Sequence, residues 1–228
     1  MKIQVFYMNR VALVAIIVVL LSNCKGYQRV IDRPITFDAE REQLTRDYLR
    51  DRYAIDQDDS NIDPKMIVLH WTEIASLEKS FDAFKNSQLP NHRGNISGAS
   101  GLNVSAHFLV DQDGTIYQLM PTTKMARHVI GLNHTAIGIE NVGGTEDTPL
   151  TEKQIRSNIW LIKQLNTAHD IEYLIGHYEY TRFEGHDLWL EVDEGYRTEK
   201  VDPGQEFMAA VRQGVADLNL KEAPKNNP

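Results

Sequence analysis

The sequence predicts an α/β domain in which helices flank a central mixed β-sheet. Short apolar segments of strand length alternate along the chain with amphipathic segments of helical length. An Asp-Gly pair at 113–114 lies between two of the apolar segments, which predicts an antiparallel hairpin within the sheet. With 228 residues, of which 42% are hydrophobic, the chain is long enough to bury one full core. Two small domains are the alternative at this length.

Each expected element follows from a local pattern of apolar and capping residues. The expected strands lie at residues 66–69, 106–110, 115–120, 136–141 and 171–175. The expected helices run from Thr36 or Asp38 to about Tyr53, and over residues 77–86, 151–168 and 205–218. The third of these helices begins with Thr151 and Gln154, the pattern of a capping box.

The folded domain is expected to span residues 61–220. A signal peptide at residues 1–23, a tether at 24–35 and a helical extension at 36–60 precede it, and a polar tail at 221–228 follows it.

The charge and the cysteine content exclude several classes of protein. The formal net charge is −8, which argues against nucleic acid as a partner because little is available to neutralise phosphates. The single cysteine excludes an internal disulfide and a cysteine-rich zinc site. Any bound metal must therefore be held by histidines and carboxylates.

The N-terminus has the pattern of a bacterial lipoprotein signal. Two basic residues precede the apolar run Val11–Leu21, which is too short for a membrane-spanning helix but fits a secretory signal. The run ends at Cys24, in a segment that resembles a lipobox, although Asn23 departs from the small residue usual before the cysteine. We expect Cys24 to be acylated and to attach the protein to the lipid bilayer. No Asp follows it, which favours the outer membrane, with the protein facing the periplasm. A plain signal peptide or an uncleaved anchor is the alternative.

Residues able to carry chemistry follow the expected strands. His70 and His177 each follow a buried apolar strand, and Glu140 lies near the end of another. Lys200 and Asp202 are two residues apart in an extended segment, so their side chains face the same side. Two histidines and one aspartate are the ligand count of a catalytic zinc site with an open fourth position. Glu140 and Lys200 would add a base and a cation.

These residues lie in motifs whose order resembles that of the zinc-dependent N-acetylmuramoyl-L-alanine amidases, relatives of animal peptidoglycan recognition proteins and of some phage lysins. The motifs are Ile-Val-Leu-His70-Trp-Thr, Ser-Ala-His-Phe-Leu-Val before the Asp-Gly pair, Ala126-Arg127-His128, Ile-Gly-Ile-Glu140-Asn, Ile-Gly-His177 and Lys200-Val-Asp202-Pro-Gly. The resemblance covers residues 64–218, and the lipobox makes the chain most similar to the outer-membrane lipoprotein branch of the family.

The resemblance implies a set of roles. His70, His177 and Asp202 would bind Zn²⁺, Glu140 would be the general base, Lys200 would stabilise the transition state, and His128 would lie at the substrate crevice. The residues 61–220 would then be a zinc amidase domain. Its partner would be peptidoglycan or soluble muropeptides, cleaved between N-acetylmuramic acid and L-alanine.

Other assignments stay open. A non-catalytic peptidoglycan-binding lipoprotein would have the same fold, and another zinc hydrolase could cut within the stem peptide. The long segment Tyr178–Glu199 between two expected ligands contains His186 and Asp187, which are rival ligands. We expect this segment to be a loop that walls the substrate groove. Its Phe183, Trp189 and Tyr196 would then offer apolar or sugar-stacking surface.

Overall fold

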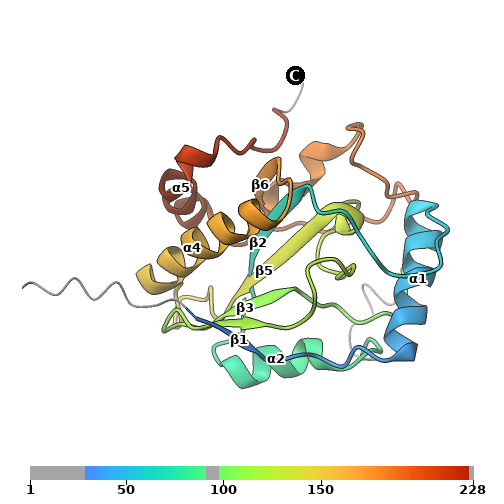
Figure 1. The fold of residues 1–228 in the computed structure, drawn as a ribbon, viewed down its shortest axis with the longest axis horizontal. Coiled ribbons are helices and arrows are strands. Elements are labelled where there is room, and N and C mark those ends of the chain that lie inside the picture. Colours follow the sequence, from blue (N-terminus) through green and yellow to red (C-terminus); the bar gives the residue numbers. More distant parts are fainter. Residues whose placement is uncertain (1–28, 91–97, 226–228) are drawn as a thin grey trace, which may run out of the picture.

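The computed structural model describes residues 29–90 and 98–225, and within them six strands form one mixed sheet (Figure 1). The strands are β1 (Val30–Asp32), β2 (Met66–Trp71), β3 (Phe108–Val110), β4 (Ile116–Gln118), β5 (Ala136–Asn141) and β6 (Tyr173–Gly176). Their order is β1-β4-β3-β5-β2-β6. β2 is parallel to β5 and β6, β3 is parallel to β5, and β4 is antiparallel to β3. The predicted mixed sheet and its hairpin are confirmed.

The helices lie close to their predicted positions. They are α1 (Ala39–Tyr53), α2 (Leu77–Lys85), α4 (Glu152–Ala168) and α5 (Gln205–Gly214), with short 3₁₀ helices at Asn133–Thr135, His177–Phe183 and Ala216–Leu218. Asp38 caps α1, and the capping box of Thr151 and Gln154 begins α4. The helix predicted over residues 205–218 ends earlier, because α5 gives way to a 3₁₀ turn.

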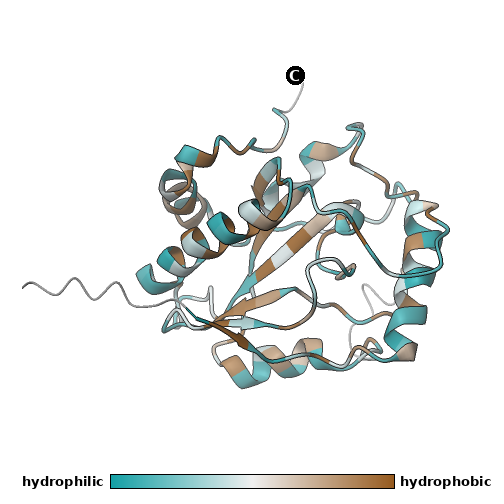
Figure 2. Cartoon of the chain, viewed as in Figure 1, coloured by the Kyte–Doolittle hydropathy of each residue, from teal (hydrophilic) through white to brown (hydrophobic). Residues whose placement is uncertain are grey.

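Side-chain alternation gives the sheet two different faces. Ile67 and Leu69 of β2, with Ile137 and Ile139 of β5, pack in one cluster with residues of α4 and α5. Residues of the other parity, such as Met66, pack in a second cluster on the opposite side. Figure 2 shows how strongly hydrophobic residues dominate the central strands. His70 and Glu140 share the parity of the second face, so the alternation directs both of them away from α4 and α5.

The ends of several strands form one row across the sheet. Val30 pairs with Ile116, which pairs with Val110; Val110 pairs with Asn141, and Asn141 pairs with Trp71. The first residue of β1 therefore lies at the same end of the sheet as the last residues of β2 and β5.

Two segments differ from the prediction. Residues 30–32 lie in the expected tether but form β1, since pairing with β4 satisfies the backbone groups of that edge. In the expected polar tail, the carbonyl of Lys221 accepts a hydrogen bond from the backbone of Leu174, and Ala223 is buried. This part of the tail therefore covers the free edge of β6.

The expected signal peptide and Cys24 lie outside the described residues, so the processing and lipidation of this region stay predictions. Among the helices of residues 29–90 and 98–225, none has the apolar length that a membrane span requires.

Candidate metal centre and substrate pockets

Three of the predicted residues meet at one point of the structure. His70 is the second-last residue of β2, His177 directly follows β6, and Asp202 lies shortly before α5. The Nδ1 atoms of the two histidines are 2.9 Å apart. The Oδ2 atom of Asp202 lies 3.2 Å from the Nδ1 of His70 and 3.0 Å from that of His177. All three side chains are buried, and they form the only such group of potential metal ligands found in the described part of the chain.

The chemistry of this cluster fits a zinc ion. Zinc–ligand distances of about 2.0–2.1 Å in a tetrahedron separate neighbouring ligand atoms by about 3.3 Å, close to the separations observed here. Burial, followed by the proximity of His70, lowers the pKa of His177 to about 4, so its ring is neutral at pH 7 as a ligand must be. Burial opposes the charge of Asp202, but its contacts with His177 and His70 outweigh this and hold its pKa well below the usual range. A cation between these three atoms would satisfy their lone pairs at once.

Glu140 and Lys200 lie beside the cluster. The register of β2 and β5 pairs His70 directly with Glu140, which is buried. Both residues line a pocket of about 270 Å³, together with His177, Lys200 and Asp202. The structure therefore brings the five residues predicted for ligation and catalysis to the wall of one pocket.

His128 also lines this pocket, but it makes a contact that the sequence did not predict. Its Nδ1 lies 3.0 Å from the Nε2 of His70, the ring nitrogen that points away from the cluster. Its other nitrogen, Nε2, is 3.3 Å from the carbonyl oxygen of Ala136. Burial, followed by repulsion from His70, lowers the pKa of His128 well below its usual value. His128 thus lines the pocket and also lies against a candidate ligand, while its role toward a substrate stays a prediction.

The rival ligands do not join the cluster. His186 bonds instead to the hydroxyl of Tyr173, at 3.3 Å, and to the backbone of Leu188. Tyr173 begins β6, whereas His177 follows its end, so His186 lies toward the opposite end of that strand. Asp187 is likewise outside the group of potential ligands in the described residues.

A second pocket, of about 360 Å³, adjoins the first and shares Arg127, His128 and Lys200 with it. Tyr48 of α1 and Tyr196 of the long loop also line it. Arg127 connects these walls, since its Nη2 donates to the Tyr196 hydroxyl at 3.1 Å and its guanidinium lies 5.3 Å from the Tyr48 ring centre. Sequence reasoning missed Tyr48, because nothing in a helical extension marks it as part of a site.

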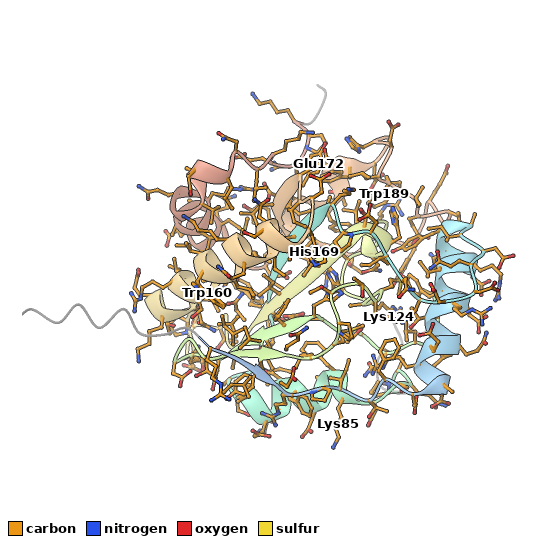
Figure 3. All side chains as sticks on the ribbon, in the orientation of Figure 1. Lys85, Lys124, Trp160, His169, Glu172 and Trp189 are labelled. Carbon is orange, nitrogen blue, oxygen red and sulfur yellow. The ribbon has the colours of Figure 1, made fainter. Side chains whose placement is uncertain are left out.

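The loop 184–199 is anchored to α1. The buried pair of Arg52 and Glu191 has a nitrogen–oxygen distance of 2.5 Å, and the Arg52 guanidinium lies 4.7 Å from the ring centre of Tyr196. Trp189, labelled in Figure 3, stacks on Tyr180. The expected exposed aromatic surface is wrong for Phe183, which is fully buried in the cluster beneath the loop because it ends a 3₁₀ helix that packs on the sheet. Tyr196 does line a pocket.

Comparisons with known proteins agree with this architecture. Residues 60–205 match the family model described as N-acetylmuramoyl-L-alanine amidase. The amidase LysC of Clostridium intestinale URNW is 22% identical, with a TM-score of 0.52 over 85% of this chain and 99% of that one. The bumblebee recognition protein PGRP-SA is 16% identical, with a TM-score of 0.51 over 88% and 99% of the two chains. Both likenesses concern the fold. A search of curated proteins found no match. Because the family model covers well over half of its length, the chain belongs to the N-acetylmuramoyl-L-alanine amidase family.

Proposed function

We propose that the protein is a zinc-dependent hydrolase that cleaves the amide bond between N-acetylmuramic acid and L-alanine in peptidoglycan or muropeptides. The observation that carries this proposal is the convergence of His70, His177 and Asp202 on one point, at a pocket that Glu140 and Lys200 also line. His70, His177 and Asp202 would hold the metal, leaving a fourth position for water or substrate.

The residues around the pocket suit an amide hydrolysis. A bound zinc ion would supply a Lewis acid and a water of lowered pKa. Glu140, buried beside His70, would accept the proton of the attacking water and return it to the leaving amine of L-alanine. The ammonium group of Lys200 would stabilise the negative charge that develops on the carbonyl oxygen.

Two other functions are possible for this fold. A binding protein without activity needs neither a complete ligand set nor a base, whereas here five suitable side chains meet at one pocket. This favours the enzyme. A peptidase that cuts within the stem would use the same groups, so only the product distinguishes it.

Mass analysis of digested peptidoglycan tests the proposal. Purified sacculi and soluble muropeptides are incubated with the zinc-loaded protein. Free stem peptides that begin with L-alanine, together with unsubstituted glycan, are the expected products. Cuts between amino acids of the stem would identify a peptidase, and binding without any product would identify a recognition protein.

We also propose that Cys24 is acylated and holds the enzyme at the outer membrane, facing the periplasm. The support is the apolar run Val11–Leu21 followed by the only cysteine of the chain. A lipid anchor would keep the domain near the cell wall.

A further inference from the structure

His70 uses its two ring nitrogens in different ways. Nδ1 points into the cluster with His177 and Asp202, while Nε2 points to the Nδ1 of His128 at 3.0 Å. A neutral imidazole carries one N–H group and one lone pair, so the tautomer of His70 decides whether Nδ1 can bind a metal. The group that contacts Nε2 therefore influences whether Nδ1 has a lone pair available for a metal.

The contacts of His128 determine the direction of the hydrogen bond between the two rings. Its Nε2 is 3.3 Å from the carbonyl oxygen of Ala136, and a carbonyl can only accept. Nε2 of His128 must then carry the proton, which leaves its Nδ1 as an acceptor. His70 consequently donates through Nε2 and keeps the lone pair of Nδ1 free for the cluster.

We propose that His128 is a positioning residue, which sets the tautomer and orientation of His70 through a relay that ends at the carbonyl of Ala136. Partners of this kind, behind a metal-binding histidine, typically contribute a factor of about 10–100 to metal affinity. The inference rests on the proposed zinc site and adds to it a role for His128 besides lining the crevice.

The surroundings hold the ring of His128 in place. The backbone N–H of His128 donates to the Oδ1 of Asn133 at 2.8 Å, which fixes the backbone from which the His128 side chain extends. The ring packs directly on Gly138 of β5, where any Cβ would come within 2.8 Å of it. It also forms a T-shaped pair with the ring of His107, with 6.0 Å between the ring centres. A ring so confined can act as a fixed acceptor.

Zinc affinity, measured by competition with a chromophoric chelator, tests the relay without relying on activity. His128→Ala removes the acceptor and should raise the zinc dissociation constant by about 10–100-fold. His128→Asn can place its Oδ1 near the position of Nδ1 and should restore most of the affinity. His134→Ala is the matched control, because it also removes a partly buried ring but one that packs on Tyr53, outside the cluster. Unchanged affinity in His128→Ala, or equal losses in the Ala and Asn variants, would overturn the proposal.

Nitrogen-15 NMR of the histidine rings supplies a second test on the wild-type protein, which needs no variant to fold. His128 should show a protonated Nε2 and an unprotonated Nδ1, and His70 should show a protonated Nε2. A proton on the Nδ1 of His128 would refute the relay. If the wild type binds no zinc, the proposed amidase function fails while the NMR result still decides the relay. If the wild type binds zinc but cleaves nothing, the zinc affinities of the His128 variants still test the relay.

Discussion

Gly138 and His128 are in direct contact, with the imidazole lying so close to β5 that no Cβ fits between them. A Cβ built on Gly138 would lie 2.8 Å from the Cδ2 and Cγ atoms of the ring and 2.9 Å from its Nδ1. Gly138 pairs with Val68 of β2, and its carbonyl accepts a hydrogen bond from the backbone N–H of His107 at 3.0 Å, so the backbone is held on both sides and has little room to move. The absence of a side chain at residue 138 is therefore a condition for the position of His128.

Gly138→Ala should displace the His128 ring and weaken zinc binding, although it removes no polar group. A contact under 3 Å with a confined ring must be relieved by movement, and overpacking of this kind costs about 1–3 kcal/mol. Chelator competition and thermal unfolding measure the two effects. Gly98→Ala is the control, because a Cβ there meets nothing within 4 Å. Normal zinc affinity in Gly138→Ala would show that the ring tolerates displacement.

Glu140→Gln should keep the metal and lose most of the activity. The two side chains are nearly isosteric, but an amide cannot accept the proton of the attacking water. We expect turnover to fall by about 10²–10⁴-fold, with the zinc content unchanged. Rates on muropeptides and metal analysis of the same sample check both parts. Near-normal turnover would place the base at another residue.

Removal of zinc should lower the thermal stability of the protein. A ligand that binds only the folded state stabilises it by about 4 kcal/mol at a thousand times its dissociation constant. Chelation should therefore lower Tm, and restored zinc should raise it again. His177→Ala should abolish this response, whereas His169→Ala should retain it, since His169 contacts Thr122 and not the cluster. A zinc-dependent Tm in His177→Ala would argue against His177 as a ligand.

Tyr196→Ala should weaken substrate binding without affecting the metal. The ring lines the second pocket, and its hydroxyl is held by Arg127. Loss of one aromatic contact of about 0.5–1.5 kcal/mol raises KM roughly two- to tenfold. Tyr196→Phe keeps the ring and should lie near the wild type. The substitution changes one side chain, whereas a deletion of residues 183–193 would also remove the buried Phe183 and Glu191. An unchanged KM in Tyr196→Ala on sacculi and muropeptides would show that the ring has no role in recognition.

Cys24→Ser should release the protein from the membrane. A serine cannot form the thioether of a lipoprotein, so labelling by a metabolic fatty-acid probe should disappear and the protein should move to the soluble fraction. The same activity on soluble muropeptides is expected before and after the change. A wild-type protein that is soluble and cleaved at another position would reject the proposal.

The strand-end residues could be predicted because each of them follows a recognisable local pattern. A histidine or glutamate at the end of an apolar strand is visible in sequence, and the carboxyl ends of parallel strands meet. Gly138 within a strand signals a close approach, yet nothing local identifies His128 as the partner. The contacts that join α1 to the site, Tyr48 with Arg127 and Arg52 with Glu191, link residues more than 70 positions apart, and sequence patterns do not encode such contacts. β1 was missed because three residues carry too short a pattern.

The row of paired residues from Val30 to Trp71 limits the distance between the candidate metal centre and a bilayer to which Cys24 would be attached. Four strand spacings separate the two residues, about 19 Å in all, and Trp71 directly follows His70. Six residues lead from Cys24 to Val30, and fully extended they reach about 20 Å. If Cys24 carries a lipid, the backbone beside the candidate metal centre lies at most about 40 Å from the membrane surface along this path. Such an enzyme would work on the layer of cell wall next to the membrane, and deeper layers would lie beyond its reach.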